Sequence, residues 1–136
     1  MMRGIKRRKL LFFTFLFTSG FVVGAALAVA QSGRFVADQK STAGGFRVVE
    51  EDGNRFLELG NDFRVEDGPD LKVVLHRQAT PRSYNRGSYV SLGALRRTNG
   101  RQRYRIPSRV DLSRFRSVVI WCEEFDVTFG HARINP

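Results

Sequence analysis

The chain has 136 residues, of which 23 are basic and 13 acidic, so its formal net charge at neutral pH is +10. It contains one cysteine, which cannot form an internal disulfide, so its folded part must be held together by an apolar core alone. No nucleophile elbow, P-loop or zinc-protease motif occurs. The motifs therefore give no support for a classical hydrolase, and whether the chain is an enzyme stays open.

Residues 1–30 predict an export signal. Five basic residues lie near the N-terminus, and the 21 uncharged residues that follow end in Ala28-Val29-Ala30, a pattern that signal peptidases accept. The uncharged run is also long enough to cross a bilayer as a helix. Two interpretations remain, a cleaved signal peptide or an N-terminal transmembrane anchor with its basic end in the cytoplasm. Either way, we expect residues 33–135 to form an exported domain that is periplasmic, extracellular or membrane-anchored and facing outside.

The rest of the chain predicts an all-β fold. Short apolar runs alternate with Gly, Pro, Asn and Asp, and no helical period lasts for ten residues. This pattern is typical of a single antiparallel β-sandwich. The expected strands are residues 34–37, 45–51, 55–59, 71–76, 89–95, 102–106, 117–122 and 127–134. The sequence Asp52-Gly53-Asn54 predicts a hairpin turn, and the polar residues 80–86 predict an exposed loop that can face a partner.

The strand predicted at residues 117–122 is the most apolar and holds the single cysteine. Alternation divides its side chains into two apolar faces, one with Val118, Ile120 and Cys122 and the other with Val119 and Trp121. We therefore predict a central strand that is covered on both sides. In the next strand, Gly130 interrupts the alternation and predicts a bulge.

Two interpretations of Cys122 remain, a redox thiol or a buried structural cysteine. A reactive thiol needs nearby positive charge and access to solvent. Cys122 is instead followed by Glu123 and Glu124 and preceded by apolar residues, and both surroundings disfavour a thiolate. The local sequence therefore favours the structural interpretation without excluding the other.

The two histidines give little support for a cofactor. After the leader the chain has no methionine, and His131 lies nine positions beyond Cys122, so the ligand set of a blue-copper site does not assemble in the sequence. The motif for covalent haem attachment is also missing. Copper or non-covalent haem stays open without support from the ligand spacing. We expect His76 on the surface and His131, beside the predicted bulge, in a structural hydrogen bond.

Positive charge is concentrated in residues 82–116, which contain ten arginines and one acid. This segment predicts a basic face that includes Arg96, Arg97, Arg101 and Arg103. On an exported protein, such a face favours an anionic polymer or a lipid surface and disfavours nucleic acid. The alternative is a solvated face without a partner.

The order of several motifs resembles one known family. Gly33-x-Phe35 and Gly45-Phe46 are followed by FLELGNDFRVEDGPDLKVVL at residues 56–75, and then by YRIP, VDL and SVVIWCEEFDVTFGHARI within residues 104–134. Together they resemble the electron-transfer DM-thirteen domain, found in Skeletor-type and Knickkopf-type extracellular proteins and in small bacterial exported proteins. The resemblance implies a redox or electron-transfer role centred on Cys122 and a redox partner protein. A non-catalytic binding or structural module is the alternative.

Overall fold

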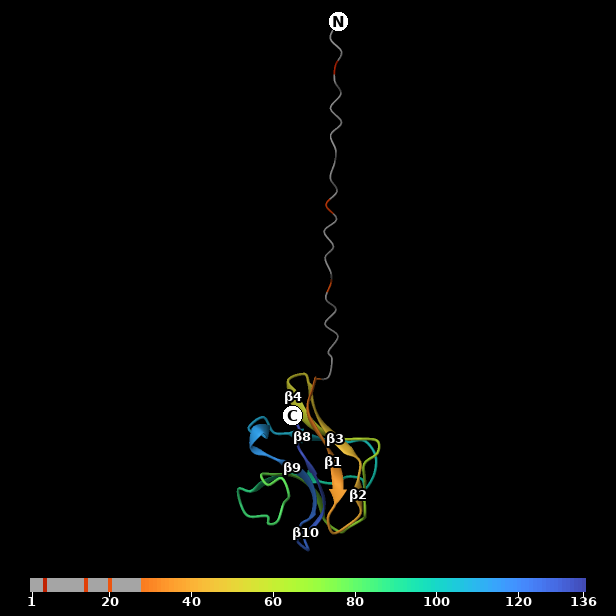
Figure 1. The fold of residues 1–136 in the computed structure, drawn as a ribbon, viewed down its shortest axis with the longest axis vertical. Coiled ribbons are helices and arrows are strands. Elements are labelled where there is room, and N and C mark those ends of the chain that lie inside the picture. The colour runs from red at the N-terminus through yellow and green to blue at the C-terminus, as the bar shows by residue number, and fades with distance from the viewer. Residues whose placement is uncertain (1–3, 5–13, 15–19, 21–27) are drawn as a thin grey trace.

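The computed structural model describes residues 4, 14, 20 and 28–136 (Figure 1). The predicted leader therefore lies outside the described residues, apart from three isolated positions and its last three residues. Within the part of the chain that is described, no helix has the length and apolar character needed to cross a membrane. Whether the leader is a signal peptide or an anchor stays a prediction.

The described domain is built from β-strands and one short 3-10 helix. The strands are β1 (Ala28–Ala37), β2 (Thr42–Ala43), β3 (Gly45–Glu51), β4 (Asn54–Leu59), β5 (Arg64–Val65), β6 (Leu71–His76), β7 (Tyr89–Ala94), β8 (Gln102–Ile106), β9 (Ser117–Cys122) and β10 (Val127–Arg133). The 3-10 helix η1 (Leu112–Arg114) precedes β9 and is capped by Asp111, whose side chain accepts the Ser113 N–H. The predicted all-β class is confirmed.

Eight strands form one antiparallel sheet in the order β7-β6-β9-β10-β1-β3-β4-β8, while β2 and β5 pair separately. β1 joins the two halves of this sheet, because its N-terminal part pairs with β3 and its last three residues pair with β10. The sheet curls until its two edge strands, β7 and β8, lie near each other. We predicted a sandwich, in which two separate sheets pack face to face. The structure instead has one continuous, nearly barrel-shaped sheet, because β1 pairs with a strand of each half.

The predicted strand positions agree closely with the structure. β3, β6, β8 and β9 have the predicted bounds, whereas β1 begins six residues before the predicted position 34. The predicted hairpin turn joins β3 to β4, and both Asp52 (φ 51°) and Gly53 (φ 75°) have positive φ. A two-residue turn with this geometry matches the twist of the paired strands.

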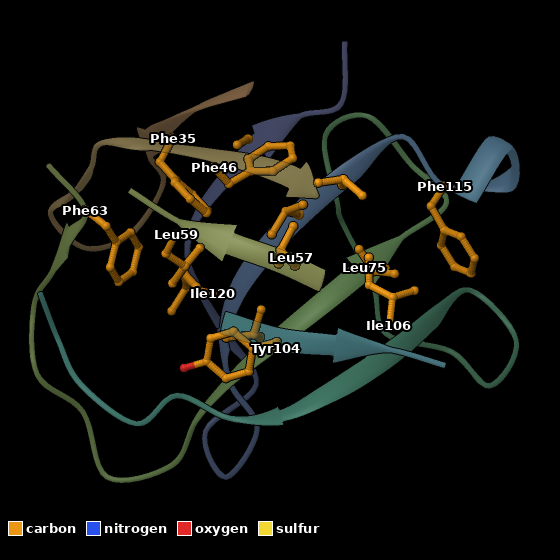
Figure 2. Close-up of a cluster of buried hydrophobic side chains, with 14 of the residues drawn as sticks. Phe35, Phe46, Leu57, Leu59, Phe63, Leu75, Tyr104, Ile106, Phe115 and Ile120 are labelled. Atoms are coloured by element: carbon orange, nitrogen blue, oxygen red, sulfur yellow. The ribbon is translucent and has the colours of Figure 1, made fainter. Parts of the chain in front are cut away.

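The apolar core fills the inside of the curled sheet. Figure 2 shows side chains from opposite parts of the sheet meeting in one interior, among them Phe35, Leu57, Tyr104, Phe115 and Ile120. Burying a large apolar side chain contributes about 1.5–3 kcal/mol relative to leaving it exposed. With no disulfide available, this cluster is the main source of stability.

The outer face of β6 and β9 is covered by the loop of residues 77–88. Tyr84 of this loop and Tyr89 pack against a second buried cluster of Val74, Val119 and Trp121. Every residue of β9 is therefore buried, which confirms the predicted central strand with two covered faces. Most of residues 80–86 are exposed, as predicted, but Tyr84 is half-buried and anchors the segment to the sheet.

Candidate functional site

Cys122 lies on the inner face of β9, within the main apolar core. Its side chain is a free thiol and only 1% of the residue is exposed. In the sheet it is opposite Leu71 of β6 and Val127 of β10. Glu123 and Glu124, which follow it, are exposed. A bulky partner thiol therefore has no direct access to Cys122 in this structure.

Trp121, the preceding residue, belongs to an aromatic cluster on the outer face. The Tyr84 ring stacks on the Trp121 ring with centroids 4.2 Å apart and planes 11° from parallel. Tyr89 contacts the same indole edge-on, with centroids 5.3 Å apart. The indole Nε1–H donates a hydrogen bond to Asp126 Oδ1 at 3.0 Å. We call Tyr84, Tyr89, Trp121 and His76 the outer aromatic cluster.

The phenol of Tyr84 is held in its neutral form. Its hydroxyl oxygen lies 2.6 Å from Thr128 Oγ1. Burial raises the pKa of Tyr84 to about 12; the hydrogen bond with Thr128 acts in the opposite direction, and the negative charges of Asp38 and Asp126 raise the pKa further. Tyr84 thus stays protonated at any physiological pH.

His76 is fully buried beneath this loop, so the prediction that it lies on the surface is wrong. Its Nδ1 accepts the Gln78 N–H at 2.9 Å, and its Nε2 lies 2.8 Å from the Ser83 carbonyl oxygen. Because Nδ1 accepts a hydrogen bond, it carries no proton. Because a carbonyl oxygen can only accept, Nε2 carries the proton, and the ring is therefore neutral. The histidine therefore holds the start and the middle of the loop, with both of its nitrogens satisfied.

The predictions for His131 and Gly130 are confirmed. His131 Nδ1 lies 2.7 Å from Asp38 Oδ2, and the side chain is almost inaccessible. The pairing of β10 with β9 shifts between Thr128 and Gly130, which marks the bulge. Glycine is needed there because a Cβ at position 130 would lie 2.4 Å from the Cβ of Thr42.

The candidate cofactor ligands do not converge. Within the described part of the chain, no group of three His, Cys, Asp or Glu side chains is placed to hold a metal ion. His76 is opposite Ser117, at the far end of β9 from Cys122, and His131 is opposite Val119 on the other face of the sheet. The residues present therefore do not fit haem or copper bound jointly by Cys122 and a histidine.

Glu58 is the centre of an arginine cluster on the outer face of β3, β4 and β8. Arg47 donates from Nε and Nη2 to Glu58 Oε1 at 2.9 and 2.7 Å, and Arg103 donates from Nε to Oε2 at 2.6 Å. Arg101 Nε lies 3.9 Å from Oε1. The strand register causes this arrangement, because Glu58 is directly opposite Arg47 on one side and Arg103 on the other.

The pKa of Glu58 falls below its usual value. Burial acts to raise this pKa, since only 3% of the side chain is exposed, but hydrogen bonds from Arg103 and Arg47 and the charges of both arginines outweigh burial. The carboxylate is therefore ionised under ordinary conditions and holds both guanidinium groups in fixed orientations.

The predicted arginine face is divided between two kinds of environment. Arg96, Arg97 and Arg101 are exposed, and the Arg96 guanidinium lies 4.7 Å from the Tyr104 ring centroid. Arg97 donates to the Arg101 carbonyl oxygen. Arg103 is instead paired with Glu51 and Glu58. The four side chains lie around β8; three of them are exposed, and Arg103 is held between two carboxylates.

The fold and the geometry define an all-β domain with one buried thiol, an adjoining outer aromatic cluster and an arginine cluster. The chain belongs to the Electron transfer DM13 family, whose model matches residues 34–134. This match confirms the resemblance noted in the sequence. Neither the curated proteins nor the solved structures contain a chain that matches this one.

Proposed function

We propose that this chain is an exported electron-transfer module in which Cys122 is the redox group and Trp121 connects it to the surface. The observation that carries the proposal is the stacking of Tyr84 on Trp121, at 4.2 Å between centroids, because Trp121 directly precedes the only cysteine in the sequence. Membership of the Electron transfer DM13 family supports a redox-related role. Export rests on the leader predicted from residues 1–30.

The first step is oxidation of the Trp121 indole by a one-electron oxidant, such as the metal centre of a partner protein. The indole gives one electron to this oxidant, and its Nε1 proton moves along the existing hydrogen bond to Asp126. In the second step the Cys122 thiol gives one electron to the indole radical and one proton to water, while Asp126 returns its proton to Nε1. Because Cys122 is 1% exposed, release of the thiol proton should limit the rate.

The turn between β9 and β10 is the surface where we expect a redox partner to dock. Phe125 is 64% exposed at this turn and is flanked by Glu123, Glu124 and Asp126. Asp126 is also the residue that binds the Trp121 indole. An apolar contact surrounded by carboxylates favours a partner with a basic rim around its redox centre.

Photochemical oxidation tests the proposed route. A photogenerated tris(bipyridine)ruthenium(III) complex should produce a neutral indole radical in the wild-type chain, detected by transient absorption. Trp121→Phe should abolish the radical, whereas Tyr104→Phe, a matched change in the main core, should leave its yield unchanged. Cys122→Ala should lengthen the lifetime of the radical, because its electron donor is removed. An unchanged lifetime in Cys122→Ala would exclude Cys122 as the donor.

A second candidate function is docking to an anionic polymer or lipid surface through Arg96, Arg97, Arg101 and Arg103. The observation in its favour is the exposure of the first three of these side chains. Retention on heparin or on anionic vesicles should fall steeply with salt. The double variant Arg96→Gln/Arg97→Gln should lose most of this retention while keeping its fold. Unchanged retention in this variant would reject the face.

A further inference from the structure

We infer that an outer groove at the β1 corner binds an acidic oligosaccharide whose sugars carry carboxylates. The groove has a volume of about 660 Å³ and lies where β1 passes from β3 to β10. Its size falls within the usual range of small-ligand sites. Neither Cys122 nor Trp121 lines it, so the inference is independent of the electron-transfer proposal.

The floor of the groove is open because two neighbouring positions have no side chain. Gly60 N–H donates to the Gly45 carbonyl oxygen at 2.8 Å, so the two glycines lie side by side. A Cβ on Gly45 would be 3.3 Å from the Gly33 carbonyl oxygen and 3.6 Å from Arg34 Nη1, a side chain that also lines the groove. Any larger residue at position 45 would therefore enter the space beside this guanidinium.

Two arginines at the groove are held in place by carboxylates. Arg34 Nη2 lies 3.1 Å from Asp62 Oδ2, and Arg47 is fixed by Glu58. The Gly45 N–H and, after it, Arg34 lower the pKa of Asp62 by hydrogen bonding, which keeps it ionised. A guanidinium has five N–H donors, so each arginine retains donors after this pairing. These donors are arranged in the planar fork that matches a carboxylate.

Two further arginines make the groove positively charged. Arg101, with a side chain 57% exposed, lies 3.9 Å from Glu58, and exposed Arg133 has its Nη2 3.4 Å from Thr80 Oγ1. Four arginines and two carboxylates line the groove, which leaves a net charge of +2 before any histidine is protonated. An anionic ligand is therefore favoured over a neutral or cationic one.

The remaining lining residues favour a sugar over a simple ion or a lipid. Ser32 and Asn135 add a hydroxyl and an amide, which can bind sugar hydroxyls, while Val36, 53% exposed, offers a small apolar surface to a sugar ring. A groove of this size exceeds what a single phosphate or sulfate would fill. Phe46 also lines the groove but is only 4% exposed, so it offers little surface to an acyl chain. A short oligosaccharide with carboxylates can pair with the arginines, form hydrogen bonds with Ser32 and Asn135, and place a sugar ring against Val36.

Calorimetric titration of the full-length chain with trigalacturonate tests the inference. We expect binding that weakens as salt is added, whereas neutral maltotriose should give none. The double variant Arg101→Gln/Arg133→Gln should bind at least about tenfold more weakly, because it loses two charge-assisted contacts. Gly45→Val should also weaken binding by filling the floor. Arg109→Gln/Arg114→Gln removes two exposed arginines outside the groove, so it is the charge-matched control and should bind like the wild type.

Circular dichroism of each variant distinguishes loss of the groove from loss of the fold, and the small change Gly45→Ala provides a second steric variant if Gly45→Val does not fold. Absence of trigalacturonate binding to the wild type would overturn the inference. Equal affinity in Arg101→Gln/Arg133→Gln and the wild type would also overturn it, as would equally tight binding of polyglutamate. Cys122→Ala should bind trigalacturonate normally, so failure of the redox proposal leaves this result unaffected.

Discussion

At the scale of single residues, Cys122 is the side chain whose surroundings decide most about function. It is buried between apolar neighbours on the inner face of β9. Cys122→Ser places a hydroxyl in this site without a visible partner and should lower the free energy of unfolding by about 1–3 kcal/mol. Cys122→Ala leaves only a small cavity and should be milder. Denaturant unfolding of both variants measures the difference.

The same burial predicts that an impermeant alkylating reagent labels Cys122 slowly in the native chain and rapidly after unfolding. Under the structural interpretation both variants keep the activity of the wild type as long as they fold. Fast labelling of the native thiol would contradict the burial argument. A stable Cys122→Ala variant that loses electron transfer would favour the redox role.

Glu58 is the second residue whose replacement should be informative. Glu58→Gln removes the carboxylate that orients Arg47 and Arg103, and it should lower the free energy of unfolding by about 1–3 kcal/mol. The pKa of Glu58 is lowered in the folded chain, so its contribution is complete above about pH 5 and is lost as the pH falls through the lowered pKa. The wild type should therefore lose stability on acidification more steeply than Glu58→Gln.

Urea unfolding at pH 7 and at acid pH measures this difference. The matched control is Glu66→Gln, which removes only the exposed pair with Lys40 and should change stability by less than about 1 kcal/mol. A Glu58→Gln variant as stable as the Glu66→Gln control would show that the cluster adds no stability.

Residue-level predictions from the sequence succeeded where the local pattern was decisive. Strand alternation placed Cys122 and Trp121 on opposite buried faces, as the structure confirms. His76 could not be placed in the same way, because its burial depends on Gln78 and Ser83 folding back over it. Glu58 gave no signal, since its arginine partners come from two other strands and depend on the register.

At the scale of elements, the loop of residues 77–88 should depend on Tyr84. Tyr84→Ala removes the ring that stacks on Trp121 and should expose the indole, which is the only tryptophan of the chain. Its fluorescence should shift to longer wavelength and become more sensitive to iodide quenching. Tyr84→Phe keeps the stack and loses only the hydrogen bond with Thr128, so its spectrum should resemble the wild type. Unchanged quenching in Tyr84→Ala would mean that other residues cover Trp121.

β6 and β9 were predictable because each is a six-residue run rich in apolar and β-branched side chains. The short strands β2 and β5 have two residues each and cannot show a period. They pair because Gly44, with φ 94°, turns the chain between β2 and β3 and leaves no room for a side chain beside Phe63. Such close packing is a tertiary property, so the sequence alone did not predict it.

At the scale of the whole molecule, the sequence predicted the all-β class and not the closure of the sheet. Sandwiches and curled sheets share the same alternation within strands. The difference lies in β1, which pairs with β3 up to Arg34 and with β10 from Phe35 onward. This change of partner also creates the corner at which the groove lies. The candidate groove was therefore beyond what strand patterns can indicate.

The last prediction concerns the N-terminus of the exported chain. Cleavage after Ala30 would give a mature protein that begins at Gln31, which can cyclise to pyroglutamate, and intact-mass analysis of the exported protein measures this directly. Recovery of only the full-length chain from membranes would contradict cleavage and support an anchor.

The structure adds a consequence for folding, because this cleavage site lies within β1. Removal of residues 28–30 would abolish the pairing of Ala28 with Glu50 and of Val29 with Val49. It would preserve all pairs from Ser32 onward, including the three residues of β1 that join β10. We therefore expect a chain that starts at Gln31 to keep its fold and to exchange the amide hydrogens at the C-terminal end of β3 faster than the full-length chain. Global unfolding of the shortened chain would show that the first residues of β1 are needed to close the sheet.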